Sequence, residues 1–215
     1  APLFRPEADL EAYRQSTRYF NLGFAAYQDK NIPVATHYAQ LSAGLWSTDP
    51  WAHFLLARCA DARSTSRADA DFRRQQEEDA LTHLNMALRI LPLGVFWREK
   101  ARLHFKLQQL ADAEESIHRA LEQSEQDDVA WHLCSVIMTQ AQQWKKAERA
   151  IKNACQLRPL NSMYRQQWIQ ILQRLGAHQQ AQRLYCFAAG ESARITQAFS
   201  RSDRALPDLQ PPGHW

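Results

Sequence analysis

The sequence predicts an all-α protein built from repeated pairs of helices. Its 215 residues include only six glycines against 32 alanines, and Ala is the best intrinsic helix former whereas Gly is among the poorest. Small and large apolar residues also recur at a fixed step along the chain, which indicates a repeat architecture. With 45% apolar residues, the chain can supply a continuous core.

The repeat is clearest in the second half of the chain. Two sets of alanines and one set of large residues each recur with a step of 34 residues: Ala113, Ala147 and Ala181; Ala120, Ala154 and Ala188; and Ile117, Ile151 and Tyr185. The pattern extends backwards, with a step of 33 residues, to Ala80, Leu84 and Ala87. Small residues at such positions let two antiparallel helices approach closely, so the pattern specifies packing.

The segment 128–159 resembles a tetratricopeptide repeat. It has the family's order of large, large, small, small, large, small, large and proline at Trp131, Cys134, Ser135, Ala147, Ile151, Ala154, Leu157 and Pro159. The unit 95–125 lacks the closing proline, and the unit 161–190 has Arg165 where Trp is expected. The units 7–46 and 50–91 are degenerate. The resemblance implies a right-handed α–α superhelix of about five helical hairpins, closed by a C-terminal capping helix.

The helices of the first two units follow from start and stop signals. The first hairpin is expected at 7–29 and 33–46. The second is expected at 50–63 and 68–91, and it opens with Asp49-Pro50-Trp51, an acceptor cap followed by proline in the first turn. The polar insertion 64–74 is interpreted either as a surface loop leading into an early start of the next helix or as a second contact surface.

The later helices are expected at 95–108, 110–123, 128–140, 144–157, 161–175 and 178–190, and a short capping helix at 191–199. Because each unit buries its apolar faces on its neighbours, residues 1–199 are predicted to form one domain. The tail 200–215 contains Pro207, Pro211, Pro212 and Gly213 without a periodic apolar face, so it is expected to be flexible.

The resemblance also implies a binding groove, lined by the exposed positions of the first helix of each unit. Carried over residue by residue, these positions are Phe20, Phe24, Tyr27, Phe54, Arg58, Arg98, Arg102, Phe105, His132, Gln166, Gln170 and Gln173. The groove would have an aromatic end, a basic middle and a glutamine-rich end. Such a surface suits a protein or peptide with apolar anchors and acidic groups.

Two alternatives concern these residues. Phe20, Phe24 and Tyr27 share helical spacing with Leu10 and Tyr13, which is also typical of a core-facing stripe. Arg98 and Arg102 could form a solvated face. The Lys and Asn clamp with which some family members bind the C-terminal carboxylate of chaperones is absent, since its Asn positions hold Phe24, Arg58, Arg102, Val136 and Gln170.

Composition and motifs weigh against several other classes of function. The formal charge of +3 does not predict a nucleic-acid partner, and no apolar run is long enough to span a membrane. No hydrolase, P-loop, zincin or dinucleotide motif occurs, and the histidines lack ligand spacing, so we expect no catalytic site, metal or cofactor. The four cysteines lack C-x-x-C pairing and are interpreted as buried thiols.

The leading hypothesis is an interaction scaffold or adaptor, for example as a subunit of a larger bacterial assembly. A secretion-type chaperone that holds an exported client is the alternative, and a nucleic-acid-associated regulator is a lesser one. The unpaired cysteines and the lack of a recognisable leader favour the cytoplasm, with the periplasm as the alternative. The sequence leaves the oligomeric state open.

Overall fold

The computed structural model describes residues 6–65 and 69–184, and it confirms the all-α prediction for this part of the chain. Its helices are α1 (Pro6–Gln28), α2 (Ile32–Leu45), α3 (Pro50–Ser64), α4 (Ala70–Ile90), α5 (Gly94–Lys106), α6 (Leu110–Gln123), α7 (Asp128–Gln140), α8 (Trp144–Leu157) and α9 (Ser162–Arg174). Residues 178–184 are helical as well. The ends of α1 to α9 lie within two residues of the predicted bounds.

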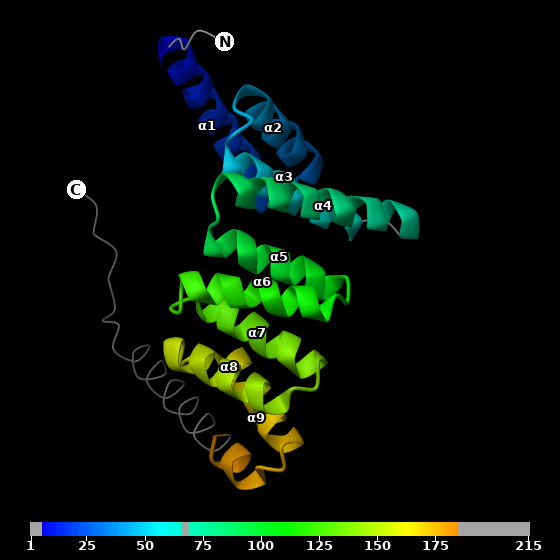
Figure 1. The fold of residues 1–215 in the computed structure, drawn as a ribbon, viewed down its shortest axis with the longest axis vertical. Coiled ribbons are helices and arrows are strands. Elements are labelled where there is room, and N and C mark those ends of the chain that lie inside the picture. The colour runs from blue at the N-terminus through cyan, green and yellow to red at the C-terminus, as the bar shows by residue number, and fades with distance from the viewer. Residues whose placement is uncertain (1–5, 66–68, 185–215) are drawn as a thin grey trace, which may run out of the picture.

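The helices pair into antiparallel hairpins that stack along the long axis of the molecule (Figure 1). Helices α1 and α2, α3 and α4, α5 and α6, and α7 and α8 form the pairs, and each pair packs against the next. Among the described helices, contacts therefore run almost entirely between neighbours in the chain, as in a solenoid. The result is the predicted α–α superhelix.

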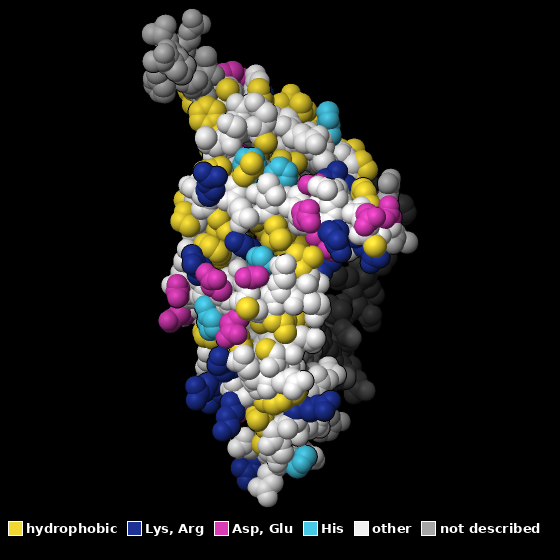
Figure 2. All heavy atoms as spheres, turned by 45° about the vertical axis from the view of Figure 1, so that its right-hand side comes forward, with side chains coloured by type: hydrophobic (Ala, Val, Ile, Leu, Met, Phe, Trp, Pro, Cys, Tyr) yellow, Lys and Arg dark blue, Asp and Glu magenta, His cyan; other side chains and the backbone are white. Residues whose placement is uncertain are grey.

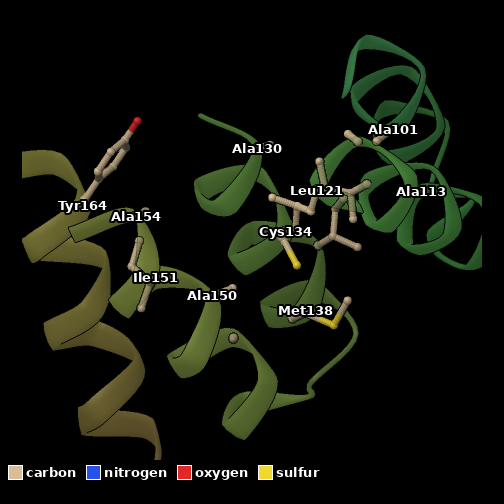
Figure 3. Packing of buried hydrophobic residues seen from close by; sticks show 14 of the residues in the cluster. Ala101, Ala113, Leu121, Ala130, Cys134, Met138, Ala150, Ile151, Ala154 and Tyr164 are labelled. Carbon is tan, nitrogen blue, oxygen red and sulfur yellow. The ribbon is translucent and has the colours of Figure 1, made fainter. Parts of the chain in front are cut away.

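The recurring small residues lie where the helices cross. Ala80, Ala113 and Ala147 are completely buried, as is Ile151 between the two alanine positions of its unit. Figure 3 shows how such residues from α5 to α9 pack into one cluster, with Ala101 and Ala113 at one side and Ile151 and Ala154 at the other. A larger side chain in place of these alanines would push the helices apart.

The degenerate first hairpin replaces part of this apolar contact with a polar one. Ser16 of α1 and Ser42 of α2 are buried, and each hydroxyl donates a hydrogen bond to the other residue's carbonyl oxygen, at 3.1 Å and 2.9 Å. The reciprocal bonds satisfy both hydroxyls and hold the two backbones close together.

Four of the five first helices, α1, α5, α7 and α9, end in the same way. Lys30, Gln108, Gln142 and Gly176 all have φ between 58° and 74°, the left-handed conformation. At every one of these turns the amide of the following residue donates to a carbonyl five residues back, as Gln143 does to Met138 at 2.8 Å and Ala177 to Leu172 at 2.9 Å. This is the Schellman ending of a helix, and here it starts the return to the second helix.

The insertion 64–74 leads into an early start of α4, which agrees with one of the two interpretations of the insertion. The side chain of Asp69 accepts the amide of Asp71 and caps α4, which extends past the ends of the neighbouring helices in Figure 1. Residues 66–68 lie outside the described part of the chain. So do the end of the helix expected at 178–190, the capping helix 191–199 and the tail 200–215, and the proposed domain limits remain predictions.

Candidate protein-binding groove

The twelve predicted groove residues differ in how far they reach solvent. Phe24, Gln166, Gln170 and Gln173 are exposed, whereas Phe54 is buried. The others, which are partly exposed, are Phe20, Tyr27, Arg58, Arg98, Arg102, Phe105 and His132. All twelve residues lie on α1, α3, α5, α7 and α9, the first helices of the successive hairpins.

An open aromatic pocket of about 410 Å³ lies between α1 and α3. Its lining comprises Tyr13, Thr17, Phe20, Asn21, Phe24, Asp49, Trp51 and Phe54. We call it the aromatic pocket. Sequence reasoning had named Phe20, Phe24 and Phe54, but it had assigned Tyr13 to the alternative core stripe and had used Trp51 only as a helix start.

The aromatic stripe on α1 is partly buried, as the core interpretation predicts, and partly exposed. Phe20 and Tyr27 pack against the core cluster between α2 and α3, so they belong partly to the interior. Phe24 stacks on Phe20 with ring centroids 6.0 Å apart and remains 41% exposed. Tyr13, at 52%, is exposed further along the same helix. The stripe thus has a buried edge that fixes it and an exposed edge that a partner could contact.

The floor of the aromatic pocket is rigid because it continues into the core. Trp51 lies edge-on to Phe54 at 5.9 Å and to Phe96 at 5.1 Å, and Phe54 and Phe96 are buried in the cluster between α3 and α5. Trp51 itself is 40% exposed. Rings held in this way offer contact area at little cost in side-chain entropy.

The basic middle of the groove is neutralised by the protein's own carboxylates. Arg102 donates to Asp61 at 2.7 Å and to Glu99 at 2.8 Å. Lys106 contacts Asp61 at 2.9 Å and Glu77 at 3.4 Å. These residues come from α3, α4 and α5, so the network ties two hairpins together. We call it the charge network.

The charge network shifts the ionisation of its members. Burial alone would raise the pKa of Asp61, but the Arg102 charge and the hydrogen bond from Lys106 together hold that pKa below its ordinary value. Burial likewise opposes ionisation of Arg102, yet Glu99 and Asp61 raise its pKa further above the ordinary value. Both groups therefore stay charged at neutral pH, and their ion pair persists.

The two other arginines of the groove differ in how firmly they are held. Arg98 forms an ion pair with Asp127, whose second carboxylate oxygen caps α7 by accepting the amide of Ala130. Arg58 has a longer contact, 3.7 Å from Glu99, and its guanidinium lies 5.0 Å from the ring centre of Tyr27. Of the three predicted arginines, Arg58 is thus the one with the weakest ion pair.

The glutamine-rich end is also hollowed. A pocket of about 680 Å³ is lined by Thr139, Trp144, Met163, Gln166, Gln167, Gln170, Ile171, Gln173 and Arg174. The predicted His132 lies beside this region and stacks on Tyr164 with centroids 4.8 Å apart, while Phe105 packs against the core cluster of α5 to α9. Burial lowers the pKa of His132, so it is neutral at physiological pH.

Solved structures share this architecture across most of the chain. MamA from Desulfovibrio magneticus RS-1 superposes with a TM-score of 0.67 at 17% identity, over 84% of this chain and 96% of that one. TTC0263, a tetratricopeptide repeat protein of Thermus thermophilus, gives 0.66 at 15% identity, over 72% and 79% of the two chains. YrrB, a tetratricopeptide repeat protein with an unusual peptide-binding site, gives 0.60 at 14%, over 86% and 90%. No protein-family model and no curated protein matches the sequence.

The chain has the tetratricopeptide repeat fold. At these identities the likeness establishes the fold alone. Placed in that fold, α1, α3, α5, α7 and α9 are the first helices of their repeats, which is the placement that the sequence predicted for the groove residues.

The described residues of this tetratricopeptide repeat array include buried thiols but no cluster of metal ligands. They contain no group of three or more His, Cys, Asp and Glu side chains that could hold a metal ion. Cys59, Cys134 and Cys155 are buried and free, as expected, and burial raises the pKa of Cys134 to about 11. No helix in the described ranges is long and apolar enough to cross a membrane.

Proposed function

We propose that this protein is an interaction scaffold, and that it binds a segment of another protein by inserting an apolar side chain into the aromatic pocket between α1 and α3. The observation that supports this most strongly is the exposure of three large aromatic side chains, Tyr13, Phe24 and Trp51, around one concavity. Exposed rings that converge on a concavity mark interaction sites more often than isolated exposed apolar residues do.

The charge network limits how much negative charge a partner can place in the middle of the groove. Arg58, Arg102 and Lys106 face Asp61, Glu77 and Glu99, so three cations are balanced by three anions. A strongly acidic segment would have to compete with these internal pairs. We propose a partner with one apolar anchor and a single acidic group near Arg58, since the Arg58–Glu99 ion pair, at 3.7 Å, is longer than the ion pairs of Arg98 and Arg102.

The glutamine-rich end can contact a partner by a different kind of bond. The exposed side chains of Gln166, Gln170 and Gln173 each carry an amide that both donates and accepts. Amides at a spacing of four and three residues along α9 can pair with the backbone of an extended segment without selecting its charge. YrrB, which has the same fold, is a tetratricopeptide repeat protein with an unusual peptide-binding site.

A peptide-display selection on the purified chain tests the proposal. We expect the selected peptides to share an aromatic or large aliphatic residue, and the Tyr13→Ser, Phe24→Ser double variant to lose them. Loss of two ring contacts of about 1 kcal/mol or more each should weaken binding at least about 30-fold. Trp51 is left intact because it also contacts buried Phe96.

A matched control separates this pocket from general surface stickiness. Leu160 is 70% exposed in the turn before α9, so Leu160→Ser removes a large apolar side chain that is more exposed than Tyr13 or Phe24 and lies far from α1. Binding that survives in the control and disappears in the double variant supports the proposal. Equal binding by the double variant and the wild type refutes it.

A further inference from the structure

The outer face of the first hairpin is unusually apolar for the surface of a solenoid. On α2, Val34, Leu41 and Leu45 are each between 37% and 39% exposed, and on α1 Leu22 is 50% exposed. The face is continuous across the two helices, because Tyr38 of α2 stacks on Tyr19 of α1 with ring centroids 6.1 Å apart. We call these six residues the end face.

Comparison with the other second helices shows that this composition is specific to α2. Each second helix contains the fully buried alanine of the repeat, and the residue just before it is Asp79 in α4, Asp112 in α6 and Lys146 in α8. In α2 that residue is Val34. A position that carries a charge in the other three described units is thus apolar in the first.

The same holds for the helix as a whole. The sequence of α2, from Ile32 to Leu45, contains no Asp, Glu, Lys or Arg, whereas α4, α6 and α8 each contain both acidic and basic residues. In Figure 2, yellow side chains spread over the upper, N-terminal part of the visible face, while most acidic and basic side chains lie below it. The outer face of α2 therefore lacks the charges that the other second helices carry.

The end face is built like one side of a helix–helix contact. Val34, Tyr38, Leu41 and Leu45 are separated by four, three and four residues, which aligns them in a single stripe along α2. In the described part of the chain α2 packs mainly against α1 and α3, and these contacts leave Val34, Leu41 and Leu45 of the stripe exposed.

We infer that the end face binds the end face of a second copy of this chain, with the two α2 helices antiparallel across a two-fold axis. Charge complementarity favours this occupant over a charged partner. An α2 without charges offers nothing to pair with a charged surface, whereas two uncharged stripes meet without like-charge repulsion. A two-fold contact also uses every apolar side chain twice. The inference concerns a surface apart from the groove, so it does not depend on the proposed function.

The test replaces the stripe with residues that the fold already accepts at the same positions. Val34→Lys and Leu41→Arg introduce the residues found at the equivalent positions of α8 and α6, Lys146 and Arg119, both exposed there. Both new side chains are basic, so they repel one another across the two-fold axis. The masses of the wild type and of this double variant are measured by light scattering and by sedimentation equilibrium over a series of concentrations. Unchanged helicity and melting temperature confirm that the variant is folded.

The expected result is a concentration-dependent dimer for the wild type and a monomer for the variant. Because the symmetry places each new charge in the interface twice, the dissociation constant should rise by at least about 100-fold. Met86→Arg is the control, since Met86 is the exposed residue of α4 equivalent to Leu41, and this variant should dimerise as the wild type does.

Three outcomes would overturn the inference. If the wild type stays monomeric at the highest soluble concentration, a second copy of this chain does not bind the end face. A double variant that dimerises as tightly as the wild type would place the interface elsewhere. Loss of dimerisation in Met86→Arg as well would show that the contact is not specific to α2.

Discussion

Replacing Arg102 with Met tests whether the charge network holds the second and third hairpins together. The substitution keeps an unbranched apolar stem and removes the guanidinium. It deletes the hydrogen bonds to Asp61 and Glu99 together, while Lys106 still contacts Asp61 at 2.9 Å and Arg58 still lies 3.7 Å from Glu99. No carboxylate is therefore left without a cation.

The expected loss follows from these contacts. A hydrogen bond to a charged group contributes about 1.5 to 3 kcal/mol, and an exposed ion pair about 1 kcal/mol or less. The Arg102 side chain is 39% exposed and its two partners are 13% and 12% exposed, so each bond lies between these limits. We expect Arg102→Met to lower the free energy of unfolding by about 2 kcal/mol, and the melting temperature by about 4 to 8 °C.

The assay is urea unfolding followed by circular dichroism, with Asp61→Asn and the double variant completing a mutant cycle. The coupling between the two sites should be about 1 kcal/mol at neutral pH. Because the folded-state pKa of Asp61 lies below its unfolded value, this coupling is fully present above the unfolded pKa and is lost as the pH falls through the folded pKa. A cost below about 0.5 kcal/mol, or the same cost in the Asp61→Asn background, would refute the reasoning.

Other variants test the turns, a histidine and a thiol. Gln142→Gly should stabilise the chain by about 0.5 to 1 kcal/mol in chemical unfolding and Gly176→Ala should destabilise it by a similar amount, since both positions have positive φ; effects of equal sign would contradict this. Burial, with the adjacent His53, lowers the pKa of His83, so the wild type should lose stability as the pH falls below about 6.5, and a pH series should show a smaller loss for His83→Gln. Cys134, with a pKa raised to about 11, should react with a thiol reagent only upon unfolding, and rapid labelling of Cys134 itself in the native protein, located by peptide mapping, would contradict its burial.

The sequence predicted the architecture because packing at helix crossings repeats with a fixed step. Ala113 and Ala147 had to be small for the same reason in each unit, so a step of 34 residues was visible without any structure. The left-handed turns were harder to recognise. Of the four turns described above, one has glycine, the residue that favours positive φ, at Gly176. Lys30 and Gln142 adopt positive φ under the constraint of the hairpin.

The candidate groove could be predicted only in part, because its properties depend on contacts between repeats. The predicted residues do lie on the first helices of their hairpins, but nothing near Arg102 in the sequence indicates Asp61, which is 41 residues away and neutralises it. Trp51 was similarly hidden, since its local signal is that of a helix start. The sequence did predict Asp49 as the cap of this helix, and its side chain accepts a hydrogen bond from the amide of Trp51 at 2.9 Å.

The contact pattern between neighbouring hairpins has a further consequence for regulation. Within the described residues, the aromatic pocket on α1 and α3 and the hollow beside α9 are joined through the successive interfaces of the intervening helices. In a quasi-one-dimensional array, the energy of an event at one end decays across each interface that it must cross. Two ligands at opposite ends would therefore occupy the molecule independently, and their saturation curves would show no cooperativity. If both hollows bind ligands, the array would fix the distance between the two ligands without coupling their affinities.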